Sequence, residues 1–221
     1  MPNPDTVPDI KTLGRFSISV MGKPVATEWP DETLRELFCS LLSPLDLYIS
    51  WDRICRSMWG IPASRSSRRR MEESFIKPLN SFLFKELGFK PCLAECEGIR
   101  IDRVRIHLDA LEFQSAALEG LRLLSQGDHA AAFEKFSRAK ALHAGVYLPG
   151  ISGKIITNTR KDLESLYRAA VTAAQPLSGT SGCSGRNRRV ESVMHMKTGR
   201  RSVDECDCGH EESVYQGYRV F

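Results

Sequence analysis

The sequence of 221 residues predicts an α+β domain over residues 10–106 and an all-α domain over residues 107–175. In the first part, short alternating apolar stretches enclose three segments of helical periodicity. In the second part, apolar residues recur every three or four positions along longer segments. Residues 1–9 are rich in proline, and residues 176–221 start with a Gly/Ser/Arg-rich stretch and lack periodicity. We therefore expect a flexible lead-in and a flexible tail.

The first domain is expected to begin with a small antiparallel sheet of two or three short strands. Residues 10–25 alternate apolar and polar side chains, as Ile18 and Val20 illustrate, and this period of two is typical of strands. Gly14 and the Met21-Gly22 pair are the expected turn positions. The sheet is therefore predicted to end before the first helical segment.

Three helices should follow this sheet. Asp31 is placed to cap the first helix, and Pro44 ends it. Ser50 is a good N-cap for the second helix, which Gly60 stops. The third segment, residues 64–88, ends at a glycine, a common C-terminal stop for helices.

The third helix combines a cluster of arginines with an ordinary apolar face. Leu79, Leu83 and Leu87 are four residues apart and share that face. Between residues 50 and 90 there are nine cations and four anions, a net charge of +5 of the kind that phosphate backbones attract. A solvated charge run before a core helix is the alternative, and this stretch taken alone favours it.

Residues 91–106 are expected to form a β-hairpin around Glu97-Gly98, because apolar and polar residues alternate again there, at Ile99, Ile101, Val104 and Ile106. Three helices closed by a hairpin make a winged helix. In that architecture the third helix enters the major groove and the hairpin contacts the DNA backbone or the minor groove.

The second domain is expected to contain helices over residues 109–126, 128–143 and 154–174. In the second of these, Ala132, Phe136 and Ala139 repeat the small–aromatic–small pattern of a tetratricopeptide-type repeat. Gly120 falls where such repeats place a small residue on the preceding helix. Because one and a half repeats cannot bury their own core, this unit should pack on the first domain or on a partner.

Seven segments carry, in chain order, a resemblance to a known family. They are IKTLGRFSISVMGKPV, ISWDRICRSMWG, PLNSFLFKELG, GIRID, HLDALEF, LSQGDHAAAFEKFSRAKALHAGVYLPG and NTRKDLESLYRAAV. Together they resemble the regulators that join an OmpR/PhoB-type winged helix to a bacterial transcriptional activator domain, the SARP-type architecture. The resemblance covers roughly residues 10–175 and depends on the order of the segments rather than on one motif.

This resemblance implies a cytoplasmic, sequence-specific regulator of transcription that binds double-stranded DNA and is not an enzyme. It implies that residues 10–106 are the DNA-binding domain and that residues 107–175 serve dimerisation or partner contact. A second copy of the chain and RNA polymerase are the candidate protein partners.

The candidate DNA contacts are the polar residues of the third helix and the cations of the hairpin. Arginine and lysine can read guanine and asparagine can read adenine, although most cations are expected to contact phosphates. The candidates are Arg65, Arg68, Arg69, Arg70, Lys77, Asn80, Ser81 and Lys85 on the helix, with Arg100 and Arg103 on the hairpin.

Three positions keep a second function open. Pro78 lies inside the helical pattern, where proline costs ~3 kcal/mol or kinks the helix unless the helix restarts at Lys77-Pro78. Phe84 and Ile99 stand where the family commonly has arginine and tyrosine. The alternative is a protein-interaction module with the same fold that has lost DNA binding, and a helix broken at Pro78 favours it.

Metal and cofactor binding are not expected. Cys206, Cys208 and His210 lie close together, with Cys183 and His195 upstream. Structural zinc usually needs two well-spaced ligand pairs, which this pattern lacks, so free thiols are the favoured interpretation and zinc is the alternative. The five histidines are scattered, and neither a P-loop nor a G-x-G-x-x-G sequence is present, so no catalytic site is expected either.

The composition indicates the general class of the protein and its expected environment. With 42% hydrophobic and 26% charged residues, the chain resembles globular proteins. No run approaches the ~18 apolar residues that a membrane helix needs, and residues 1–11 lack the basic and apolar regions of a signal peptide. Seven irregularly spaced cysteines then favour a reduced, cytoplasmic environment.

Overall fold

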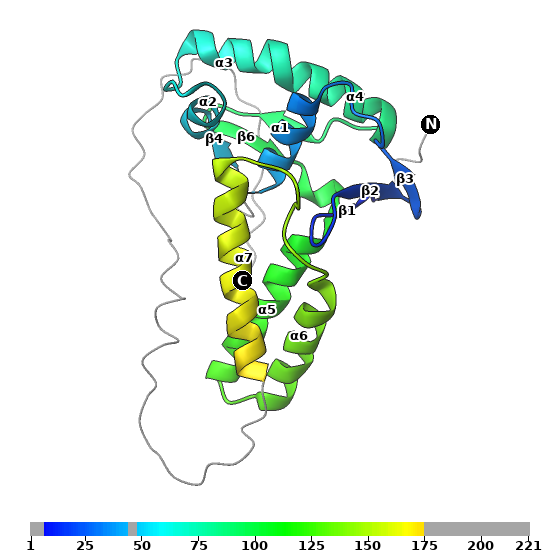
Figure 1. The fold of residues 1–221 in the computed structure, drawn as a ribbon, viewed down its shortest axis with the longest axis vertical. Helices are drawn as coiled ribbons and strands as arrows, with labels where there is room; N and C mark the ends of the chain where they lie inside the picture. The colour runs from blue at the N-terminus through cyan, green and yellow to red at the C-terminus, as the bar shows by residue number, and fades with distance from the viewer. Residues whose placement is uncertain (1–6, 44–47, 175–221) are drawn as a thin grey trace, which may run out of the picture. The chain divides into compact units, whose positions relative to one another are not determined.

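The structure is a computed structural model that describes residues 7–43 and 48–174 (Figure 1). It is a mixed α/β fold with two small sheets and several helices, consistent with a winged helix followed by a helical segment. Within the described ranges, no helix is both long enough and apolar enough to cross a bilayer.

The first sheet contains the expected antiparallel strands and a fourth strand from far along the chain. Its strands are β1 (Asp9–Lys11), β2 (Ser17–Val20), β3 (Lys23–Val25) and β7 (His107–Leu108), in the order β3-β2-β1-β7. Ile10 of β1 lies opposite Ile18 in the antiparallel pair and opposite Leu108 in the parallel pair. The antiparallel part is confirmed, whereas the parallel strand was not expected.

The helices of the first part begin where their caps predict. They are α1 (Glu32–Leu42), α2 (Trp51–Trp59), α3 (Arg65–Met71) and α4 (Lys77–Leu87), with one turn of π-helix, η1 (Glu72–Ile76), between the last two. The side chains of Asp31 and Ser50 accept hydrogen bonds from the first turns of α1 and α2, as expected. Gly60 and Gly88 end α2 and α4 in the left-handed conformation.

The expected hairpin forms, and a third strand extends it. The strands are β4 (Ile49–Ser50), β5 (Cys92–Ala94) and β6 (Gly98–Ile101), in the order β4-β6-β5. The Ile49-Ser50 pair, expected only as a helix start, also pairs with β6. A Cβ on Gly98 would lie 2.0 Å from the Ile49 carbonyl oxygen, so this close approach requires glycine.

Beyond Ile101 the strand pattern expected through Val104 and Ile106 is wrong. The Asp102 N–H donates to the Pro91 carbonyl and closes the hairpin, and the chain then turns through the short 3-10 helix η2 (Arg103–Arg105). Val104 is 91% exposed. The physical reason is that the chain must leave this sheet to reach β7 in the other one.

The helical segment matches the expected pattern closely. Its helices are α5 (Asp109–Ser125), α6 (His129–Leu142) and α7 (Lys154–Ala174). A Cβ added to Gly120 on α5 would lie 2.6 Å from the ring of Phe136 on α6. Glycine at this position therefore sets the close approach of the two helices, as the repeat-like pattern predicts.

Gly120→Ala should therefore destabilise the protein although alanine favours helix. Overpacking against Phe136 costs more than the gain in helix propensity, and we expect a net loss of about 1–2 kcal/mol. Denaturant unfolding measures this loss. In a Phe136→Leu background, where the smaller side chain opens space, the loss caused by Gly120→Ala should be smaller than in the wild-type protein. An equal loss in both backgrounds would contradict the packing explanation.

The helical segment packs on the first part of the chain, one of the two outcomes expected. Asp109 is buried at the start of α5, and its carboxylate accepts hydrogen bonds from the Thr12 N–H, the Thr12 hydroxyl and the Leu13 N–H. The Tyr147 and Thr159 hydroxyls donate to the Ser43 hydroxyl and carbonyl at the end of α1. Buried polar groups on both sides of this contact are therefore satisfied.

His107 adds a charged link at the same contact. Its imidazole lies between the carboxylates of Asp9, 2.7 Å away, and Glu112, 2.8 Å away, and Glu112 is also paired with Arg138 on α6. The hydrogen bond to Asp9, with a further one to Glu112, raises the pKa of His107. The protonated form is therefore favoured in the folded state.

This raised pKa predicts a pH-dependent stability. The contribution of His107 is fully present below its ordinary pKa near 6.5 and is lost as the pH rises through the raised value. His107→Gln should therefore lower the melting temperature more at about pH 6 than at about pH 9. Thermal unfolding of both proteins at the two pH values checks this, and a difference that is the same at both would contradict it.

Candidate nucleic-acid interface

The arginine cluster and the apolar helix form one continuous helix from Arg65 to Leu87, here called the basic helix (Figure 1). The Lys77 N–H donates to the Glu72 carbonyl, the five-residue spacing of a π-turn. Pro78, which has no N–H, then falls in the first turn of α4. The π-turn thus accommodates the proline, as a restart at Lys77-Pro78 predicts, and Pro78 does not break the helix.

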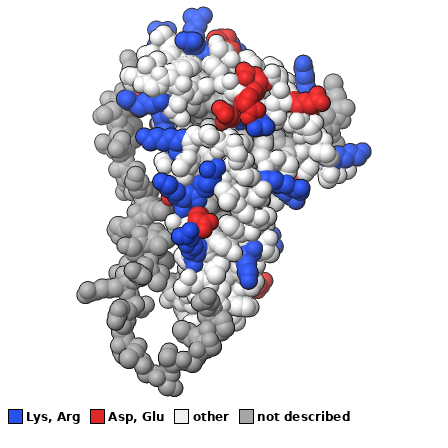
Figure 2. All heavy atoms as spheres, viewed as in Figure 1, with Lys and Arg blue, Asp and Glu red and all other residues white. Residues whose placement is uncertain are grey.

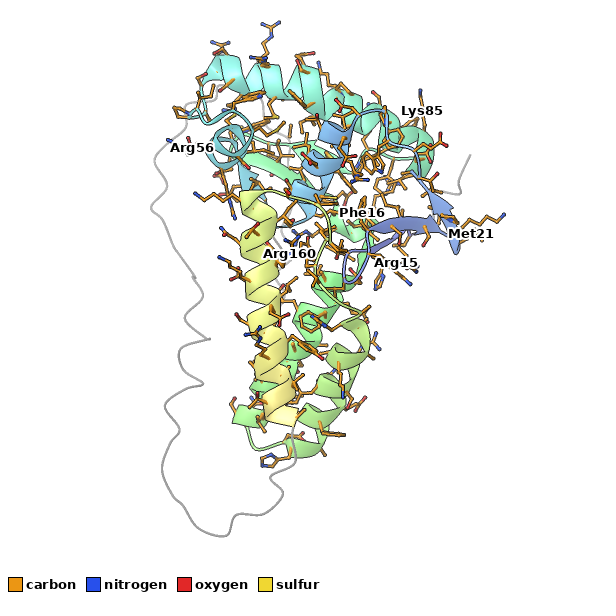
Figure 3. All side chains as sticks on the ribbon, viewed as in Figure 1. Arg15, Phe16, Met21, Arg56, Lys85 and Arg160 are labelled. Atoms are coloured by element: carbon orange, nitrogen blue, oxygen red, sulfur yellow. The ribbon has the colours of Figure 1, made fainter. Side chains whose placement is uncertain are left out.

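The basic helix buries one face and exposes a polar face. Met71, Ile76, Leu79 and Leu83 are at most 3% exposed, and the step of five from Met71 to Ile76 spans the π-turn. The opposite face carries an exposed row at steps of four, whose members are Arg65, Arg69, Glu73, Lys77, Ser81 and Lys85. Figure 3 labels Lys85 near the end of α4. Cations therefore lie along the length of the exposed face.

Two further arginines stack on tryptophans of α2. The guanidinium of Arg68 lies 5.1 Å from the ring centre of Trp51, and that of Arg70 lies 5.2 Å from Trp59. Sequence reasoning missed these tryptophans as supports of the cluster. The sequence feature that could have indicated these contacts is the tryptophan at each end of the helix that precedes the arginines.

Asn80 has a structural contact in place of the expected base contact. Its amide nitrogen donates to the Cys92 carbonyl at 2.7 Å, and its amide oxygen accepts from the Cys92 N–H at 3.0 Å. Both ends of the amide are thus used to join α4 to β5. We do not retain Asn80 among the candidate DNA contacts.

The two candidates on the hairpin differ in their positions. Arg100 lies on β6 and pairs with Glu95 across the turn of the hairpin. Arg103 lies beyond the hairpin in η2, so its expected place on the hairpin is wrong. The Trp51 indole N–H donates to the Glu95 carbonyl and joins α2 to the same turn.

Carboxylates moderate the positive charge of this surface. Lys77 pairs with Glu73 at 2.7 Å, and this hydrogen bond lowers the pKa of Glu73. The hydrogen bond from Arg56 likewise lowers the pKa of Asp52 on α2. In the view of Figure 2, Lys and Arg side chains project from the edge along which α3 and α4 run, with acidic groups nearby. The surface is therefore basic but contains acidic groups.

No feature of the described residues forms a metal site. Within residues 7–43 and 48–174, three or more His, Cys, Asp or Glu side chains nowhere come together in a way that could hold an ion. The tail candidates Cys206, Cys208 and His210 lie outside the described residues.

Three helices, a hairpin and an appended helical segment are consistent with a winged-helix protein that carries a second, helical part. No protein-family model and no curated protein matches the sequence. Among solved structures, the fold is similar to that of Mycobacterium tuberculosis EmbR, solved in complex with a low affinity phosphopeptide. The TM-score is 0.54 at 18% identity, over 76% of this chain and 44% of EmbR. This chain thus spans less than half the length of that protein.

Proposed function

We propose that the protein is a transcription regulator that binds double-stranded DNA through the basic helix. The observation that carries the proposal is the unbroken helix with cations along its exposed face, set beside a hairpin. A helix of this kind fits the major groove, and a hairpin beside it reaches the adjacent backbone. The fold similarity to EmbR agrees with a winged-helix scaffold but does not identify the ligand.

The exposed candidate contacts fall into three groups by chemistry and position. Arg65, Arg69, Lys77 and Lys85 are exposed cations suited to phosphate oxygens and guanine edges. Ser81 is an exposed hydroxyl on the same face and can contact either base edges or phosphates. Arg100 on the hairpin is the candidate contact to the backbone beside the groove.

The helical segment is proposed to serve dimerisation or contact with a partner such as RNA polymerase. A groove between α6 and α7 is lined by aromatic and small residues, among them Phe133, Tyr167 and Ala170. Phe133 is 58% exposed, and such exposed aromatic side chains are enriched at protein interfaces. This observation supports a contact function for the segment.

A second candidate function is a protein-interaction module without DNA binding. The observation that favours it is Phe84, which is 50% exposed on α4. An exposed aromatic ring on this helix suits a protein groove as well as a thymine methyl group. The unbroken helix at Pro78 removes the main argument for this alternative.

A salt-titrated binding assay of the full chain on genomic DNA fragments tests the proposal. We expect selective retention of some fragments, with an affinity that falls with salt at a logarithmic slope of about −3 to −5 for four or five phosphate contacts. Equal weak binding of all fragments, or none, would contradict the proposal and favour the interaction module.

A further inference from the structure

The start of the basic helix contains a small polar depression with an unusual set of side chains. It is open to solvent and is lined by Arg65, Arg68, Arg69 and Glu72. Three guanidinium groups and one carboxylate give this depression a net charge of +2, which attracts an anion. A single phosphate group, which carries about one negative charge in a nucleic-acid backbone, matches this positive charge better than a neutral base does.

One of the three guanidiniums is fixed before any ligand binds. Arg68 is only partly exposed, because its guanidinium stacks on the Trp51 ring at 5.1 Å. Trp51 is itself buried, and its indole N–H donates to the Glu95 carbonyl at 2.8 Å. A pre-positioned guanidinium loses less side-chain entropy when it binds an anion than a free one does.

The other two guanidiniums remain available. Arg65 and Arg69 are exposed and four residues apart on one helix face, and neither forms an ion pair or a ring contact with another described residue. Lys77 is the main cause of the lowered pKa of Glu73, and the charge of Arg69 contributes only a small part of that lowering. Glu72 is half-buried beside them and forms no ion pair with another described residue. Its carboxylate lowers the positive charge of the depression, and it limits indiscriminate attraction of polyanions.

We propose that Arg65, Arg68 and Arg69 bind one backbone phosphate of the DNA, with Trp51 as the residue that positions Arg68. This proposal deepens the proposed function and depends on it. In this proposal, the first turns of the basic helix contact the DNA backbone and fix the position of the protein on the DNA. The reading of bases is then left to the part of the helix beyond the π-turn.

Neutral phosphate analogues test this assignment directly. A DNA fragment selected by the full chain is synthesised with single methylphosphonates placed along the site. For the wild-type protein, we expect one position at which loss of the phosphate charge weakens binding about 5- to 10-fold. For Arg69→Ala, the same analogue should cause a smaller further loss than in the wild-type protein, because one of the three guanidinium contacts to that phosphate has already been removed.

Lys85→Ala is the matched control, since it removes one exposed cation from the other end of the same helix. It should weaken binding but keep the full sensitivity to that analogue. Trp51→Leu should reduce the effect of the methylphosphonate on affinity, as Arg69→Ala does. Circular dichroism checks that each variant is folded. Glu72→Gln should tighten binding to all fragments and reduce discrimination among them.

The outcomes separate this proposal from the proposed function. Selective DNA binding in which Arg69→Ala leaves the effect of every analogue unchanged would overturn the phosphate site and leave the regulator function intact. Absence of DNA binding would overturn both. We expect that Arg69→Ala reduces the effect of the methylphosphonate on affinity at one position of the DNA, and that Lys85→Ala leaves the effect at that position unchanged.

Discussion

Replacing Arg65, Arg69 and Lys85 together with alanine is expected to weaken DNA binding by about 10- to 100-fold. The magnitude of the salt slope should fall by about 2, because Arg65 and Arg69 share one proposed phosphate and Lys85 contacts another. These three side chains lie exposed on the basic helix, and none of them forms an ion pair or a ring contact with another described residue. Their removal should therefore act on DNA contacts and not on folding. Fluorescence anisotropy at several salt concentrations measures both quantities.

A matched triple variant controls for the loss of net charge. Lys11, Lys154 and Lys161 are also exposed but lie outside the basic helix. Their replacement by alanine removes the same charge from the protein. If both triple variants lose affinity equally, the effect is one of overall charge, and the assignment of the interface to the basic helix is wrong.

Asp109→Ala is expected to be the most destabilising single substitution proposed here, by about 3 kcal/mol. Asp109 is 8% exposed, and its carboxylate accepts hydrogen bonds from the N–H groups of Thr12 and Leu13 as well as from the Thr12 hydroxyl. Alanine leaves these buried donors without a partner. For a chain of this size, such a loss lowers the melting temperature by about 6–12 °C.

The same substitution at another helix start provides the control. Asp128 caps α6, where its exposed side chain accepts a hydrogen bond from the Ala131 N–H. Asp128→Ala should cost only about 1 kcal/mol, the usual value of an N-cap. Equal losses for the two variants in calorimetry would show that Asp109 acts as a cap only and does not hold the helical segment to the first sheet.

The elements of this fold were predictable where one local interaction determines them. Asp31 and Ser50 mark helix starts because their side chains accept from the next turn, and Gly120 marks a close helix contact because it lacks a Cβ. Strands β4 and β7 were not predictable. Each has only two residues, and each forms by pairing with a strand far away in sequence, which leaves no periodic signal.

The sequence predicted the candidate site as a charged helix. It did not predict which of the polar residues on that helix contact the rest of the fold. The sequence shows that Arg68, Arg70 and Asn80 are polar residues on one helix, but not which neighbours their side chains contact. Those contacts come from Trp51, Trp59 and Cys92, which lie 12 or more residues away or on another element. Tertiary packing therefore decides that the Asn80 amide joins two elements of the fold, whereas Arg68 and Arg70 are held beside rings with their guanidinium groups in fixed positions.

Arginine reactivity footprinting tests the central claim most directly. The full chain is treated with an arginine-specific dicarbonyl reagent, with and without a selected DNA fragment, and modified sites are measured by mass spectrometry. The proposed interface predicts that DNA protects Arg65 and Arg69. Arg15, exposed between β1 and β2, and Arg168, exposed on α7, should react as before. Unchanged reactivity of Arg65 and Arg69 in the complex would contradict DNA binding through the basic helix.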